Sequence, residues 1–238
     1  MFRFSVIALL VFVTAGCATS PETKQAIWES GRIVRPGVED GLCMHRRISM
    51  VGDRCFKDDG KKTAAIVYLH GCAGFDLPNQ AQIDMLAKLG LPIFAPSSFG
   101  RPHRRAQCGG GNMTARMAMR AEEAQIAAER VKEIPWVDPG KVVLAGFSEG
   151  GFGVAAYGGD AYAAHIILGA DCKHGLHAPA DKPILFIAGE YDHGLSCSSW
   201  NADFEAHYVK SGHTVSDDPR TYGIIEDFLK KHGIVAGG

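Results

Sequence analysis

Short runs of consecutive apolar residues alternate along this chain with segments of helical periodicity, and no other feature constrains the fold as strongly. The apolar runs cover residues 64–69, 92–95, 142–145, 166–168 and 184–187. They lack polar alternation, which is typical of strands covered on both faces. The remaining periodic segments predict helices over residues 80–89, 114–134, 150–157 and 219–231. The pattern therefore predicts an α/β domain with a mostly parallel central sheet and helices on both faces.

The composition fits one folded domain. The chain has 238 residues, of which 46% are hydrophobic and 21% are charged. This content is too apolar for a disordered chain, and the length suits a single well-filled core. Lys and Arg (25) nearly balance Asp and Glu (26), so the net charge of −1 gives no support for nucleic-acid binding. Residues 44–56 predict an antiparallel hairpin leading into the sheet, and residues 207–210 predict a short last strand.

The N-terminus has the layout of a secretory signal. Arg3 supplies a positive charge, and residues 4–13 form an apolar run that is too short to span a bilayer as a helix. The segment that follows, from Thr14 to Cys17, resembles a bacterial lipobox. The resemblance implies cleavage before Cys17 and lipidation of its sulfur.

This interpretation divides the chain into three parts. Residues 1–16 are expected to be the signal peptide, residues 17–39 a lipidated N-terminus and tether, and residues 40–238 the folded domain. Ala18 favours the outer membrane of a bacterial envelope as the destination. A plain signal peptide with cleavage nearby is the alternative, and it leaves the protein free in the periplasm or secreted.

Six cysteines remain besides Cys17: Cys43, Cys55, Cys72, Cys108, Cys172 and Cys197. An even number in an oxidising compartment favours disulfides over metal ligands. A cluster with metal-binding side chains does occur, but it completes no four-ligand zinc pattern: Asp171, Cys172, His174 and His177. We therefore expect neither a metal nor a cofactor.

The segment from Gly146 to Gly150, GFSEG, is a G-x-S-x-G motif between a buried strand and a helix. In this context the motif predicts a nucleophile elbow, a sharp turn that holds a serine hydroxyl at the end of the strand. The turn strains the serine backbone and needs small neighbours, which the two glycines supply. Ser148 is therefore the candidate nucleophile, at a helix N-terminus that favours developing negative charge.

A serine nucleophile needs a base that removes its proton and an acid that orients the base. The expected order along the chain is serine, acid and histidine. Asp192 lies on the loop after the last apolar run, and His213 precedes the last helix, so we expect a triad of Ser148, His213 and Asp192. Alternative acids and weaker candidate bases remain open: Asp171, Glu190, His193, His207 and His232.

An oxyanion hole needs two N–H donors. One is expected from Glu149, the residue after the nucleophile. The other is expected from Cys72, in the loop HGCAG that follows the first apolar run. His70 opens this loop, and we expect it to be a buried structural residue without a catalytic role.

Taken together, the segments VYLHGCAGF, GFSEGG, GEYD and SGH resemble the α/β-hydrolase superfamily, and most closely its dienelactone hydrolase-like branch. The resemblance covers residues 61–232. It implies an α/β-hydrolase fold without a large lid and the hydrolysis of esters or lactones. The name-giving enzymes of that branch use a cysteine nucleophile, whereas this chain has Ser148, so lactone specificity is not carried over.

In that fold the loop over residues 97–105 faces the active-site edge of the sheet. We expect it to bind substrate through Ser98, Phe99, Arg101 and Arg105, with Arg101, Arg104 or Arg105 attracting a carboxylate or phosphate. An exposed, solvated loop is the alternative. Sequence proximity and the order of strands in this fold favour the disulfides Cys43–Cys55, Cys72–Cys108 and Cys172–Cys197.

These features predict a serine hydrolase that cleaves small to medium carboxylic esters or lactones through an acyl-serine intermediate. A peptidase of prolyl-oligopeptidase type is the nearest enzymatic alternative. A non-catalytic envelope protein that binds a ligand on a hydrolase scaffold is the alternative from another class. The expected partners are a small-molecule ester and, through the anchor at Cys17, a membrane.

Overall fold

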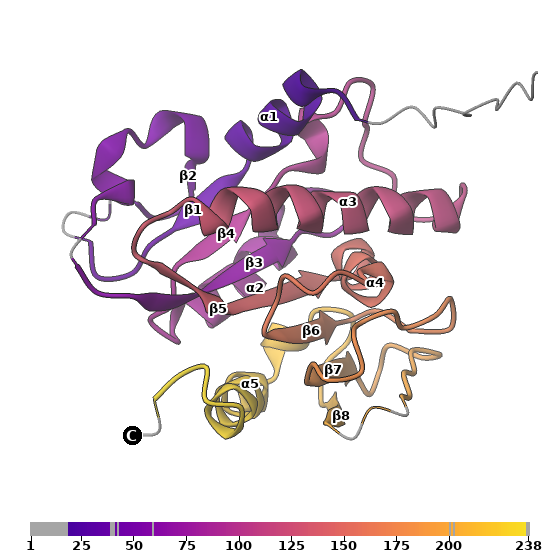
Figure 1. Ribbon diagram of the computed structural model, residues 1–238. Helices are drawn as coiled ribbons and strands as arrows, with labels where there is room; N and C mark the ends of the chain where they lie inside the picture. Colours follow the sequence, from indigo (N-terminus) through magenta and orange to yellow (C-terminus); the bar gives the residue numbers. More distant parts are fainter. Residues whose placement is uncertain are drawn as a thin grey trace, which may run out of the picture.

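A computed structural model describes residues 19–38, 41, 43–58, 60–199, 201 and 203–236. These residues form an eight-stranded sheet in the order β2-β1-β4-β3-β5-β6-β7-β8. From β4 to β8 each neighbouring pair is parallel, whereas β1 runs antiparallel to both β4 and β2 (Figure 1). The strands are β1 (Arg32–Val34), β2 (Arg46–Arg47), β3 (Thr63–Leu69), β4 (Ile93–Ala95), β5 (Val137–Phe147), β6 (Ala164–Leu168), β7 (Ile184–Gly189) and β8 (Phe204–Val209).

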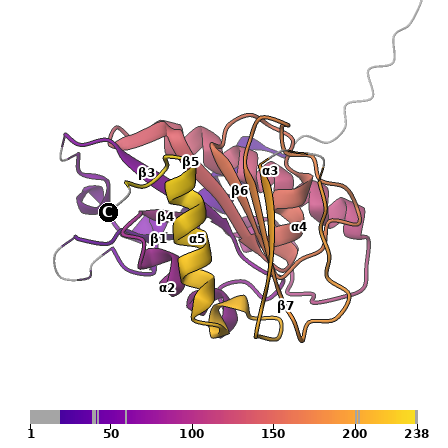
Figure 2. The ribbon, with the colours of Figure 1, turned by 90° about the horizontal axis from the view of Figure 1, so that it is seen from below.

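The helices cover both faces of the sheet, as the alternation of strands and helices predicts. On one face lie α1 (Pro21–Glu29), α3 (Met113–Lys132) and α4 (Glu149–Ala156), which share a hydrophobic core with inward-facing residues of the strands. On the other face lie α2 (Leu77–Ala87) and α5 (Arg220–Lys231), which close a second core. Figure 2 views the sheet from the side of α5. The central strands β6 and β7 are buried along their whole length, which explains their unbroken apolar sequences.

Helix starts depend on capping residues that hydrophobic periodicity alone overlooks. The helix expected over residues 80–89 begins at Leu77, because Asp76 accepts a hydrogen bond from the N–H of Asn79 and Pro78 occupies the first turn. Asn112 caps α3 in the same way through the N–H of Ala115. The last strand is also longer than expected, since it begins at Phe204.

The expected hairpin over residues 44–56 is wrong. Only Arg46–Arg47 is a strand, and it pairs with β1 from outside that segment. The rest forms two 3₁₀ turns, Ile48–Met50 and Asp53–Phe56. Strand propensity misled here because the two turns bury single residues, Ile48 and Cys55, and leave Met50 exposed, so no strand ladder is needed to cover them.

The expected tether is also corrected, because much of residues 17–39 belongs to the domain. Helix α1 starts at the N-cap Ser20 and buries Ile27 and Trp28 against the sheet, and β1 then pairs with β4. Because most residues of α1 are polar, the composition of this segment does not indicate that two of them pack into the core. Cys17 and the rest of residues 1–18 lie outside the described residues, and within the described ranges no helix is long and apolar enough to cross a membrane.

Candidate active site

Ser148 lies at the sharp turn between β5 and α4, as the G-x-S-x-G motif predicts. Its backbone has φ 55° and ψ −117°, a strained conformation for a residue with a side chain. The neighbouring chain leaves no room for a side chain at Gly150, where a Cβ would lie 1.9 Å from the carbonyl oxygen of Leu69. At Gly146 a Cβ would lie 2.4 Å from the carbonyl oxygen of Gly150. Gly150 therefore lets the elbow pack against β3, and Gly146 lets the end of β5 pack against α4.

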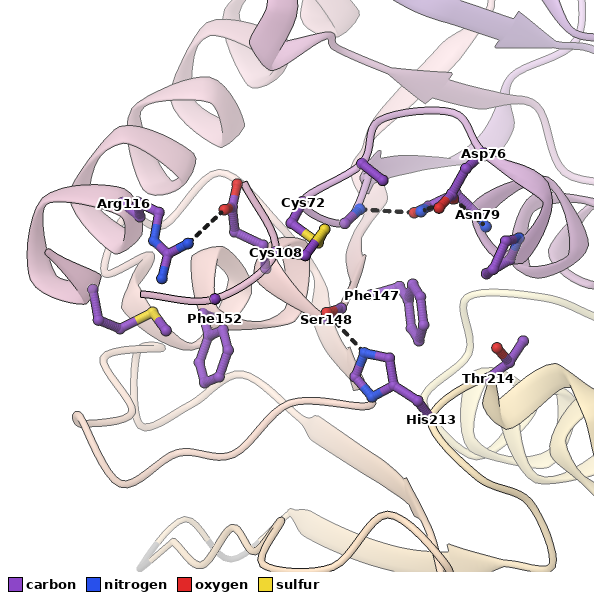
Figure 3. Close-up of a pocket in the computed structure, with 16 residues that line it drawn as sticks. Cys72, Asp76, Asn79, Cys108, Arg116, Phe147, Ser148, Phe152, His213 and Thr214 are labelled. Carbon is purple, nitrogen blue, oxygen red and sulfur yellow. Dashed lines mark hydrogen bonds and ion pairs between the residues drawn. A yellow bond between two sulfur atoms is a disulfide. The ribbon is translucent and has the colours of Figure 1, made fainter. Parts of the chain in front are cut away.

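The structure brings Ser148, His213 and Asp192 into one hydrogen-bonded chain. The Nε2 atom of His213 lies 2.9 Å from Oγ of Ser148 (Figure 3). Its Nδ1 atom lies 2.5 Å from Oδ2 of Asp192. The ring of Phe147 packs against the imidazole with 4.9 Å between centroids. Asp192 follows β7 and His213 follows β8, so neighbouring parallel strands deliver both to the same edge of the sheet.

Two of the alternative residues, Asp171 and His207, take other partners. Asp171 is buried and pairs with the backbone N–H and the ammonium group of Lys173. His207 lies 3.6 Å from Glu205 on β8. Cys172, from the cluster that carries metal-binding side chains, is bonded to Cys197. Among the residues that the structure describes, no group of three or more His, Cys, Asp or Glu could hold a metal ion.

The loop after β3 is held in place by hydrogen bonds to two side chains, those of Asn79 and His70. Asn79 accepts a hydrogen bond from the N–H of Gly71 at 2.7 Å and from the hydroxyl of Tyr68 at 3.0 Å. His70 is buried, donates from Nδ1 to the carbonyl of Gly71 and accepts from the N–H of Ser98 at Nε2. Burial lowers the pKa of His70 well below its usual value, so the ring is neutral. This confirms His70 as a structural residue.

The two residues expected to supply oxyanion amides, Cys72 and Glu149, lie in the wall of the pocket that holds Ser148. The N–H of Gly71 is already bonded to Asn79, which leaves the amide of Cys72 as the next donor along the loop. Glu149 occupies the first turn of α4, where backbone N–H groups have no acceptor within the helix. Both residues line the same pocket as Ser148 and His213.

This pocket has a volume of about 440 Å³ and mostly apolar walls. It lies over the elbow, where Ser148, His213 and the Cys72–Cys108 disulfide all border it (Figure 3). Its apolar walls come from the loop after β3, the starts of α2 and α3, the end of β5 and α4: Ala73, Pro78, Met113, Phe147 and Phe152. Arg116 is the cation in the wall, and Asp76 is the acid near the opposite end.

A buried cluster of arginines surrounds the carboxylate of Glu149, and the sequence analysis missed it. Glu149 is only 4% exposed. Arg104 lies 2.5 Å from its carboxylate, Arg116 lies 3.6 Å away and Arg120 lies 3.9 Å away. An uncompensated buried carboxylate beside a developing oxyanion would oppose its charge, and these guanidinium groups offset that effect.

Helix α3 supplies two of the arginines of this cluster, Arg116 and Arg120. Arg120 and its neighbour on the same face, Glu123, are both fully buried. Arg120 donates to Glu123, to the hydroxyl of Ser98 and to the carbonyl of His70. The signal was present in the spacing, because an arginine and a glutamate three residues apart on a helix lie on the same face.

The loop over residues 97–105 does not place the predicted substrate-binding side chains in the wall of the pocket that holds Ser148. Ser98 is fully buried and bonded to Glu123. Arg101 pairs with Glu122 and Glu123 on α3 at 2.7 and 3.0 Å. Phe99 stacks on His70, and Arg105 is exposed. None of the predicted residues lines the pocket, because acidic residues of α3, far away in sequence, turn the loop's charges toward that helix.

All three expected disulfides are confirmed. Cys43 pairs with Cys55, Cys72 with Cys108 and Cys172 with Cys197. The second joins the loop after β3 to the loop after β4, and the third joins the loops after β6 and β7. In both cases the two strands are neighbours in the sheet, so the loops that follow them lie at the same edge.

The sequence matches the profile of the Dienelactone hydrolase family over residues 53–215, which is more than half of the chain and spans all three triad positions. The chain belongs to the dienelactone hydrolase family. Membership supports a hydrolase that acts on ester-type bonds. No curated protein sequence matches this chain.

Solved structures share the fold at low sequence identity. Esterase PE8 is 17% identical with a TM-score of 0.51, and the match covers 72% of this chain and 94% of that one. A dienelactone hydrolase-like promiscuous phosphotriesterase, P91 from metagenomic libraries, is 16% identical with a TM-score of 0.51 over 73% and 89%. An acylaminoacyl peptidase from Pyrococcus horikoshii is 13% identical with a TM-score of 0.51 over 74% and 38%. These similarities concern the fold.

Proposed function

We propose that this dienelactone hydrolase family member cleaves carboxylic esters through an acyl-enzyme formed on Ser148. The observation that carries the proposal is the chain of hydrogen bonds from Asp192 through His213 to Ser148, at 2.5 and 2.9 Å, at the base of an apolar pocket. A serine hydroxyl becomes a useful nucleophile only when a base in hydrogen-bond reach takes its proton. His213 meets that requirement.

In the first half of the reaction, His213 takes the proton of Ser148 as Oγ attacks the ester carbonyl carbon. Asp192 accepts the Nδ1–H of the imidazole and stabilises the imidazolium that forms. The amides of Cys72 and Glu149 donate to the oxyanion of the tetrahedral intermediate. The intermediate then collapses, and the alcohol leaves with the proton from His213.

In the second half, a water molecule attacks the acyl-serine. His213 takes a proton from this water, the same two amides stabilise the second oxyanion, and Ser148 leaves as it regains its proton. The acid product then leaves the pocket. The atoms balance without a metal or a redox partner: ester and water give acid and alcohol.

The pocket supports small to medium esters as the substrate class. Its volume of about 440 Å³ is at the small end for ligand sites, and its walls contact the substrate mainly through apolar groups. Met113 and Phe152 line the side nearest α3 and α4, where an acyl or alcohol chain can lie. The buried carboxylate of Glu149 is balanced by arginines and is not itself a base for the reaction.

Steady-state hydrolysis tests this proposal. Wild-type protein is given p-nitrophenyl esters from acetyl to octanoyl, with the matching p-nitroanilide amides to detect a peptidase. We expect turnover of the esters, falling as the acyl chain outgrows the pocket, and its loss in Ser148→Ala and His213→Ala. Matched controls are Ser49→Ala and His207→Ala, at side chains outside the pocket. Turnover of amides in place of esters, or turnover that survives Ser148→Ala, contradicts the proposal.

We also propose that the chain is lipidated at Cys17 and held at a bacterial envelope membrane. The folded domain starts close to that position, since Thr19 donates to Glu122 at 2.8 Å and accepts from Arg101 at 3.1 Å. An anchor at Cys17 would therefore hold the middle of α3, around Glu122, close to the bilayer. Metabolic labelling with a fatty-acid analogue should mark the wild type and not Cys17→Ser, whereas an unlabelled soluble protein supports the plain signal peptide.

A further inference from the structure

One disulfide lies in the wall of the pocket. Cys72 belongs to the loop after β3 that supplies the proposed oxyanion amide, and Cys108 belongs to the loop between β4 and α3. Both residues line the pocket, and Figure 3 shows their sulfur–sulfur bond beside Ser148. The other two bridges in the described part of the chain lie outside this wall.

The loop that carries Cys108 has little else to hold its end in place. Residues 105–112 are exposed throughout. Gly109, Gly110 and Gly111 all have positive φ values, of 113°, 64° and 72°. Glycine adopts many backbone conformations, so these three residues do little to restrict the loop. Before this run, Arg104 pairs with Glu149, and Arg116 donates to the carbonyl of Gln107 at 3.0 Å. The bridge is the covalent link that fixes this loop against the pocket.

The bridge is also attached to the loop after β3, where a small displacement of the proposed oxyanion amide would lower kcat. Asn79 holds Gly71 from one side of the loop after β3, and the disulfide holds Cys72 from the other side. An oxyanion donor works through its distance to the charged oxygen, so a displaced amide loses most of its effect on kcat. By contrast, the contacts of His213 with Ser148 and Asp192 do not run through this loop.

Exposure separates the bridges as targets for a thiol. Cys43 and Cys55 are 0% and 1% exposed, and Cys172 and Cys197 are both partly buried. Cys72 is also partly buried, but its partner Cys108 is exposed. Thiol–disulfide exchange requires direct approach of a thiolate to a sulfur, so access decides which bridge reacts first. The pocket bridge is open to attack at Cys108.

We propose that Cys72–Cys108 is a redox-sensitive positioning bridge, which keeps the site competent when oxidised and lowers its turnover when reduced. This inference rests on the proposed ester hydrolysis. A dithiol is the reductant: one thiolate attacks Sγ of Cys108, forms a mixed disulfide and releases the Cys72 thiolate. The second thiol of the reductant then displaces Cys108, which also leaves as a thiolate. Two electrons pass to the protein bridge, and the dithiol becomes a cyclic disulfide.

The first test compares two double variants of the full-length protein. Cys72→Ala/Cys108→Ala removes the pocket bridge, and Cys43→Ala/Cys55→Ala removes a bridge at the other end of the sheet as the matched control. We expect kcat for p-nitrophenyl acetate to fall at least tenfold in the first variant, with a smaller change in KM. We expect the control to keep its kcat per folded molecule, measured well below its unfolding midpoint. Equal kcat in the two variants overturns the inference.

The second test uses the wild type and does not depend on how the variants fold. The protein is incubated with graded dithiothreitol, and free thiols are alkylated and mapped by mass spectrometry while kcat is followed. We expect kcat to fall in step with alkylation of Cys72 and Cys108, while the circular dichroism spectrum stays unchanged, and to return on reoxidation. Full activity with both cysteines alkylated contradicts the inference. Absence of turnover in the oxidised wild type instead contradicts the proposed function, so the two failures are distinct.

Discussion

Acid should destabilise this domain through one buried histidine, His165 on β6. The side chain is fully buried, both of its ring nitrogens lack a hydrogen-bond partner among the described residues, and its neighbours are the rings of Tyr157 and Tyr162. Burial is the largest cause that lowers the pKa of His165 to about 4, and the charge of Lys182 adds to it. In the unfolded chain the same imidazole titrates near pH 6.5.

The sign and size of the effect follow from proton linkage. Above pH 6.5 the imidazole is neutral in both states, so His165 adds no pH dependence. Between pH 6.5 and 4 the unfolded chain binds a proton that the folded protein does not, so the free energy of unfolding falls as the pH falls. The difference in pKa corresponds to about 3 kcal/mol below pH 4, of which about 2 kcal/mol is lost by pH 5.

Urea unfolding of the wild type and His165→Leu, followed by circular dichroism from pH 7.5 to pH 5, measures this quantity. Leu removes the titrating group and keeps the position apolar. We expect the free energy of unfolding of His165→Leu, taken relative to that of the wild type, to rise by about 2 kcal/mol as the pH falls from 7.5 to 5. The exposed His174→Gln serves as the control and should track the wild type. Parallel pH profiles for the wild type and His165→Leu would refute the reasoning.

Three further predictions test the elbow, the loop after β3 and the acid. Gly150→Ala should destabilise the fold by about 3 kcal/mol or more in urea unfolding, because the new Cβ would meet the carbonyl oxygen of Leu69 at 1.9 Å, and an unchanged midpoint counts against this packing. Asn79→Ala should cost about 2 kcal/mol and lower kcat, because the N–H of Gly71 loses its acceptor; unaltered kcat would separate Asn79 from the proposed oxyanion loop. Asp192→Asn should lower kcat about 10³-fold or more with little change in KM, measured with a p-nitrophenyl ester, and an equal loss in Asp171→Asn would undo the choice of acid.

The sequence predicted those parts of the site that depend on the order of strands. Ser148, Asp192 and His213 each follow a buried parallel strand, and such strands end at one edge of the sheet, so local motifs sufficed to bring them together. The disulfide pairs followed from the same order. Predicting that these residues meet, and that the elbow is strained, required only the local motifs and the order of strands in the fold.

The sequence did not predict features of the site that depend on contacts between residues far apart in the chain. The arginines after β4 turn toward Glu122, Glu123 and Glu149, which a local reading of residues 97–105 does not contain. The arginine in the pocket wall is instead Arg116, on a helix for which the sequence predicted no site residue. Helix α1 was missed for a related reason, because only two of its residues are buried and the rest resemble a polar linker.

The central claim is that His213 activates Ser148 as a nucleophile. A fluorophosphonate probe tests it most directly, with the labelled residue identified by peptide mass spectrometry in the wild type, His213→Ala and His207→Ala. The account predicts labelling at Ser148 in the wild type and His207→Ala, and its loss in His213→Ala. A folded, disulfide-intact wild type that stays unlabelled, or a label on another serine, contradicts it.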